Sequence, residues 1–118
     1  MVVAFATRDG RHVQGELRRA PLVVLYEVSC EGARFERAAS FSSADARSED
    51  RIRAMIGAAV VFVGAIGPST AARLAARGIR PATASEGTSI QDLLAAMVRT
   101  IPQVLEPSVD AAVRSLAV

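Results

Sequence analysis

Apolar runs of strand length alternate with helix-type spacings along this chain. Three runs typical of buried strands cover residues 2–6, 22–28 and 59–63. The last of them has no polar alternation, which predicts a central strand covered on both faces. The segment 33–41 does alternate, with Phe35, Ala39 and Phe41 expected on one face. With the turn at 29–32 it predicts a β-hairpin.

Two helices are expected on either side of the run 59–63. Ile52, Met55 and Ile56 form the apolar stripe of the first, which begins near two acidic residues that suit the positive end of a helix dipole. Pro68 fits the first position of the second helix, and Gly78 fits its end. A short strand at 79–83 should follow.

A third helix follows, with Thr88 at the start of a capping box and Pro102 as its terminator. Its apolar positions are Ile90, Leu93, Leu94, Met97, Val98 and Ile101. The element order β-β-β-α-β-α-β-α predicts one α/β domain, a mixed five-stranded sheet flanked by helices. We expect that domain at 1–105 and a tail at 106–118 that can form a short helix.

Composition narrows the class of protein. The chain has 118 residues, of which 51% are apolar, enough for one core but too few residues for two ordinary domains. No apolar run approaches the ~20 residues that span a bilayer. The lone cysteine, Cys30, excludes an internal disulfide and suits a reducing cytoplasm. The net charge of +2 is too small to indicate nucleic-acid binding.

The long loop 7–20 holds most of the candidate binding residues. Its positive charge comes from Arg8, Arg11, Arg18 and Arg19. Guanidinium groups suit polyanions, although a solvated charge run is the alternative. His12, the only histidine, is a candidate metal ligand or a solvated loop residue. Glu16 can act as an oxygen ligand or as the partner of an arginine.

The turn after the run 59–63 is the second candidate segment. It contains Gly64, Ile66 and Gly67 and opens the helix at Pro68. Ligands of open α/β sheets favour this edge, and free amides at a helix start favour negative charge. The alternative is a plain strand-to-helix turn. We expect the loop 7–20 to fold over this turn and to form one electropositive recess with it.

The sequence contains few features that are typical of an enzyme active site. A nuclease of the ribonuclease-H type needs clustered carboxylates for two metal ions, and Asp9, Glu27 and Glu36 are not an obvious cluster. There is no nucleophile elbow, Walker loop or Cys-x-x-Cys motif.

Several short motifs in a fixed order carry a family resemblance that spans about residues 2–101. They are residues 3–10 (VAFATRDG), 12–13 (HV), 26–28 (YEV), 63–68 (VGAIGP) and 76–79 (ARGI). In this order they resemble the dinitrogenase iron–molybdenum cofactor biosynthesis family, of the NifX, NafY and NifB C-terminal type. The resemblance implies a ribonuclease-H-like α/β fold.

The resemblance also implies a function. It points to a non-enzymatic carrier of an iron–sulfur precursor of the cofactor, in nitrogen fixation, with cofactor assembly proteins and apo-dinitrogenase as partners. The family commonly has His-Phe-Gly in the first long loop, where this chain has Glu16, Leu17 and Arg18.

That departure keeps two further functions open. One is an interaction module that docks on nitrogenase or its assembly proteins without a cluster, and the other is a small-molecule enzyme on the same fold. The apolar hairpin strands also leave an edge where a second copy of the chain can form a homodimer.

Overall fold

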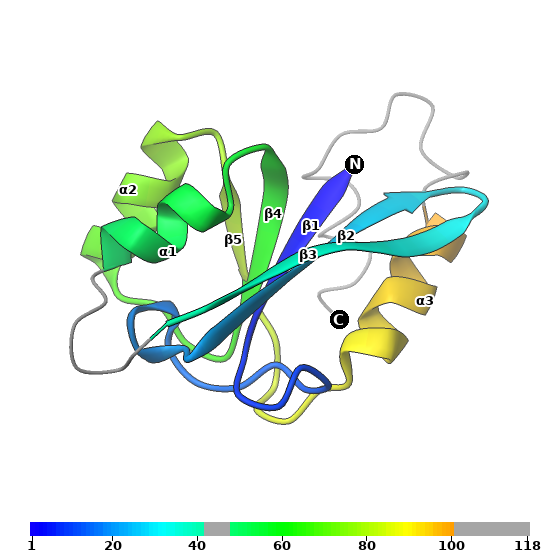
Figure 1. The fold of residues 1–118 in the computed structure, drawn as a ribbon, viewed down its shortest axis with the longest axis horizontal. Coiled ribbons are helices and arrows are strands. Elements are labelled where there is room, and N and C mark those ends of the chain that lie inside the picture. Colours follow the sequence, from blue (N-terminus) through cyan, green and yellow to red (C-terminus); the bar gives the residue numbers. More distant parts are fainter. Residues whose placement is uncertain (42–47, 101–118) are drawn as a thin grey trace.

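The computed structural model describes residues 1–41 and 48–100 (Figure 1). The strands are β1 (Val2–Thr7), β2 (Leu22–Ser29), β3 (Gly32–Ser40), β4 (Ala58–Val63) and β5 (Arg80–Thr83). The helices are the 3-10 turn η1 (Leu17–Arg19), α1 (Ser48–Ala54), α2 (Pro68–Ala76) and α3 (Ile90–Thr100). The expected order of elements is confirmed. The loop 7–20 is shorter than expected, because η1 occupies part of it.

The strands form one mixed sheet in the order β3-β2-β1-β4-β5. β2 runs antiparallel to its neighbours β1 and β3, whereas β4 is parallel to both β1 and β5. The carboxyl ends of β1, β4 and β5 therefore meet at one edge of the sheet, the lower edge in Figure 1. The loops that follow these strands lie together there.

Helices cover both faces of the sheet, with α1 and α2 on one side and α3 on the other (Figure 1). β1 presents Ala4 and Ala6 to the side of α1 and α2, and Val3 and Phe5 to the side of α3. The alternation follows from the period of two along a strand. The residues of β1 from Val3 to Ala6 are fully buried on both faces of the sheet, which explains the lack of polar alternation there.

The hairpin differs from its expected alternation at one point. Leu25 lies opposite Arg37 and Tyr26 opposite Phe35, so Glu36 is an extra residue, a β-bulge. The bulge moves Phe35 to the face of α3, where its ring meets Tyr26 edge-on at 5.6 Å. Phe41 packs on the opposite face. The prediction that both phenylalanines share a face was therefore wrong.

Two details of the helices also differ. Ile56 lies beyond the end of α1 and is 60% exposed, so it is not part of the apolar stripe. Ser89, rather than Thr88, caps α3: its hydroxyl accepts from the Asp92 amide at 3.4 Å, while the Thr88 hydroxyl donates to the Ser85 carbonyl. The expected start of α2 at Pro68 is confirmed. Ile101, Pro102 and the tail 106–118 lie outside the described residues.

Candidate ligand-binding site

Two loops cross in direct contact where β1 and β4 end. The Gly15 carbonyl accepts from the amides of Gly64 at 2.9 Å and Ala65 at 3.2 Å. Gly15 has a φ of +72°, a conformation that glycine adopts without strain. The expected contact between the loop 7–20 and the turn after β4 is thus observed. The two backbones can approach this closely because Gly15 and Gly64 have no side chains.

A recess of about 270 Å³ lies beside this crossing. It is lined by Glu16, Leu17, Arg18, Ile66, Gly67, Pro68, Ser69 and Thr70. Residues at the start of α2 form one wall, and amides in the first turn of a helix have no acceptor within that helix. Pro68 has no amide hydrogen, so the first-turn donors on this wall are those of Ser69 and Thr70. The helix dipole adds to the preference for negative charge.

An ion pair crosses the opposite wall of the recess. The Arg18 Nε atom donates to Glu16 Oε2 at 2.7 Å. This hydrogen bond and the charge of Arg18, with a smaller contribution from Arg19, lower the pKa of Glu16. Glu16 is therefore a carboxylate throughout the neutral range. The recess offers a cation, helix-start amides and one oxygen ligand.

Arg19 does not line this recess. It lines an adjoining groove of about 190 Å³ with Arg8, Gln14, Gly15, Glu16 and Ala20. The expected single electropositive recess is therefore two hollows with Glu16 at their common boundary. Gly64 lines neither hollow. Its amide donates to the Gly15 carbonyl and so helps to hold the two loops together where they cross.

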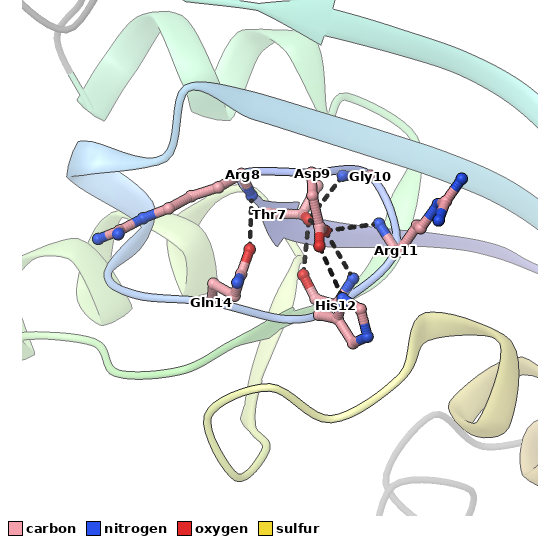
Figure 2. Close-up of polar contacts among 7 residues, drawn as sticks. All are labelled: Thr7, Arg8, Asp9, Gly10, Arg11, His12 and Gln14. Carbon is pink, nitrogen blue, oxygen red and sulfur yellow. Dashed lines mark hydrogen bonds and ion pairs between the residues drawn. The ribbon is translucent and has the colours of Figure 1, made fainter.

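His12 is separate from both hollows. Its Nδ1 atom is 2.7 Å from Asp9 Oδ2, in a tight turn that Asp9 organises (Figure 2). Asp9 Oδ1 also accepts from the amides of Arg11 and His12, and from the Thr7 hydroxyl. These bonds, with that of His12 first, lower the pKa of Asp9 well below its usual range. His12 lines neither the recess nor the groove, so the structure does not bring it together with Arg18, and its role as a metal ligand stays a prediction.

The pairing with Asp9 sets the tautomer of His12. A carboxylate only accepts, so Nδ1 must carry the hydrogen and Nε2 is the free acceptor of the neutral ring. We expect Asp9→Asn, whose amide nitrogen can donate to Nδ1, to move the hydrogen to Nε2. Imidazole ¹⁵N shifts at neutral pH, measured on both proteins, would report the exchange. Unchanged shifts in Asp9→Asn would show that Asp9 does not set the tautomer.

Two residues that hold the loop 7–20 in place were not predicted from the sequence, Glu86 and Arg51. Glu86 reaches from the loop before α3, and its carboxylate accepts from the Gly15 amide at 3.0 and 3.2 Å. Arg51 is fully buried, and its Nε donates to the carbonyl of Ala20, at the end of η1, at 2.7 Å. Burial lowers the pKa of Arg51, an effect that the nearby charge of Asp50 opposes. No local signal marked either residue, since both bridge segments far apart in the sequence.

Arg8 was recognised only as part of the loop charge. Its guanidinium lies over Gly15, with Nη2 3.7 Å from the position a Cβ on that glycine would take. Figure 2 shows its side chain extended away from the Asp9–His12 turn. Arg11, the remaining arginine of the loop, lines neither hollow.

Other candidate chemistry is sparse in the described part of the chain. Residues 1–41 and 48–100 contain no group of three His, Cys, Asp or Glu side chains that could hold a metal ion. Cys30 is exposed in the turn between β2 and β3 and lines neither hollow. No described helix is both long and apolar enough to cross a bilayer.

Comparison with known proteins finds a matching family, a similar sequence and a similar structure. The family model described as "Dinitrogenase iron-molybdenum cofactor" matches residues 1–100. Protein NifX of Sinorhizobium fredii is 32% identical over an alignment of length 114, and the match covers 85% of this chain and 71% of that protein. The crystal structure of a protein named PH0822 has the same fold, with a TM-score of 0.70, 20% identity and coverage of 94% of this chain and 97% of the other. This chain belongs to the dinitrogenase iron–molybdenum cofactor family.

Proposed function

We propose that this protein is a non-enzymatic carrier in the assembly of the nitrogenase iron–molybdenum cofactor. It holds an anionic iron–sulfur precursor in the recess between Glu16–Arg18 and the start of α2, and passes it on to cofactor assembly proteins or to apo-dinitrogenase in the cytoplasm. The observation that carries the proposal is the convergence of Arg18 and the first turn of α2 on one 270 Å³ recess. Family membership supports the role in cofactor biosynthesis.

The donor set of the recess suits reversible capture. Arg18 and the amides of Ser69 and Thr70 supply positive potential for a polyanion. Glu16 supplies one carboxylate oxygen, where the family commonly has a histidine. Among the described residues 1–41 and 48–100, no thiolate and no imidazole lines the recess. A cluster held by charge and at most one ligand can be released without breaking several metal–ligand bonds.

Substitutions of Arg18 and Glu16 should therefore have opposite effects on cluster retention. Removing the charge of Arg18 takes away charge-assisted hydrogen bonds worth about 1.5–3 kcal/mol each, so we expect Arg18→Gln to weaken retention of a cluster about tenfold or more. Glu16→His restores the histidine that the family commonly has at this position, and an imidazole there should strengthen retention. The variant Arg73→Gln, on the exposed surface of α2, is the matched control.

The measurement is anaerobic reconstitution with ferrous iron and sulfide, followed by desalting, an absorption spectrum and an iron assay. The wild type and Arg73→Gln should retain iron–sulfur absorption, and Arg18→Gln should lose most of it. Retention that is equal in Arg18→Gln and Arg73→Gln would remove the recess as the binding site. Absence of retained iron from the wild type and from Glu16→His would contradict the carrier function.

One observation favours the second candidate, an interaction module without a cluster. Among the residues that the structure describes, the only carboxylate lining the recess is that of Glu16, and it is already paired with Arg18. Such a module would bind nitrogenase or its assembly proteins equally well before and after reconstitution. Pull-down from nitrogen-fixing cells with both forms separates the two candidates. The third candidate, a small-molecule enzyme, calls for clustered acidic residues around the glycine turn. Residues 1–41 and 48–100 contain no group of three His, Cys, Asp or Glu side chains that could hold a metal ion.

A further inference from the structure

A row of aromatic rings crosses the sheet on the face of α3 and ends at the outer strand β3. Phe62 of β4 stacks on Phe5 of β1, with ring centroids 5.4 Å apart. Tyr26 of β2 meets Phe5 edge-on at 6.1 Å and Phe35 of β3 at 5.6 Å. Phe5 and Phe62 are buried, whereas Phe35 is 54% exposed. The row is therefore open at the edge of the sheet, where a ring from a further strand can extend it.

The backbone of β3 is open to a further strand on one side. β3 is an outer strand of the five-stranded sheet, and residues 33–36 are all exposed (Figure 1). An outer strand presents N–H and C=O groups that another strand can pair with. The bulge at Glu36 interrupts the regular backbone and confines such pairing to the residues around Phe35. An interface of this size is small, so association through it should be weak.

The charges of β3 favour one way of pairing it with a second copy of the chain. Opposite residues of antiparallel strands lie close together, and like charges there are destabilising. A two-fold axis at Arg34, Glu36 or Arg37 would place that charge opposite itself. An axis at Phe35 instead places Arg34 of each copy opposite Glu36 of the other. Arg34 has no ion pair within residues 1–41 and 48–100, and Arg37 engages Oε1 of Glu36, so Oε2 can accept from the second copy.

We infer that β3 pairs antiparallel with β3 of a second copy about a two-fold axis at Phe35, which joins the two sheets into one. Each contact is then made twice, as in any isologous interface. The two Phe35 rings meet and continue the aromatic row, and Arg34 and Glu36 form two ion pairs between the copies. The inference does not depend on the carrier function, because no residue of β3 lines the recess.

The first test measures the mass of the protein in solution by sedimentation velocity, at concentrations from about 10 µM to about 1 mM because small interfaces associate weakly. The average mass of the wild type should rise from 12.4 kDa toward twice that value. Phe35→Thr removes the ring but keeps a residue that favours strands, and Arg34→Glu places two acids opposite each other. Each should weaken dimerisation about tenfold or more.

A charge exchange and a distant charge reversal are the controls. Arg34→Glu combined with Glu36→Arg should restore dimerisation to within about threefold of the wild type, because opposite charges face each other again. Arg73→Glu, on the exposed surface of α2, should leave it unchanged. Thermal melts confirm that each variant is folded. A wild type that stays monomeric, or a double variant no better than Arg34→Glu alone, would overturn the inference, and the edge would then be open to a strand of another protein.

The second test locates the two-fold axis by disulfide cross-linking in a Cys30→Ser background. Phe35→Cys places two thiols opposite each other, where paired β-carbons lie about 4.5–5.5 Å apart, close to the span of a disulfide. Oxidised glutathione should convert this variant largely to a covalent dimer. Ile56→Cys is the matched control, since Ile56 is 60% exposed but lies outside β3, and it should stay largely monomeric. Equal cross-linking of the two variants would contradict an axis at Phe35.

Discussion

Replacing Gly64 with alanine is expected to destabilise the protein by about 2–3 kcal/mol, because two backbones pass too closely at this residue. A Cβ on Gly64 would stand 2.8 Å from the Gly15 amide nitrogen and 3.1 Å from its carbonyl oxygen. It would also stand 2.5 Å from Glu86 Oε2, a flexible side chain that can move. The Gly15 backbone can yield only by weakening its two bonds to the turn after β4. We therefore expect the recess to be distorted as well.

Gly67, in the same turn, provides the control. A Cβ there meets nothing within 4 Å, so Gly67→Ala should lose less than about 1 kcal/mol, mainly through the poorer capping of α2. Urea unfolding of the three proteins measures the difference. If Gly64→Ala were as stable as Gly67→Ala, the contact between Gly15 and Gly64 would not be the constraint that we infer.

Arg51→Ala is expected to have the second large effect, a loss of about 3 kcal/mol. The variant empties a fully buried site and leaves the Ala20 carbonyl without its donor, 2.7 Å away. It also removes the guanidinium that lies 5.0 Å from the centre of the Phe41 ring. Arg51 links α1 to the end of η1, so its loss should also weaken cluster retention by Arg18.

Arg53→Ala, on the exposed side of the same helix, should change stability by less than about 0.5 kcal/mol. The comparison separates the buried guanidinium from the general effect of removing an arginine from α1. Urea unfolding gives the stabilities, and reconstitution with iron and sulfide gives the binding effect. Similar unfolding midpoints for Arg51→Ala and Arg53→Ala would contradict a structural role for Arg51.

The elements themselves could be predicted from the sequence, because their signals are local. The unbroken apolar run at 59–63 corresponds to β4, which is second from the edge of the sheet and has neighbours on both faces. Pro68 marks the start of α2, since a residue without an amide hydrogen fits the first helical position. Together with the order of the motifs, these signals were sufficient for the fold and the family.

The site could be predicted only in part. The contact of the loop 7–20 with the turn after β4 follows from a general property of α/β sheets, the meeting of loops at the carboxyl ends of parallel strands. The division of the arginines between two hollows does not follow from it. Arg18 turns toward α2 and Arg19 toward Arg8 because η1 places consecutive side chains on different sides.

Taken alone, the sequence determined which segments become strands and helices, which family the chain resembles and which loops carry its charged residues. The tertiary structure decided the bulge at Glu36, the burial of Arg51, the clamp of Glu86 on Gly15 and the separation of His12 from the recess. The physical reason is the range of the interactions. Periodicity and capping act within a few residues, whereas register, burial of a charge and contact between loops depend on segments that only folding brings together.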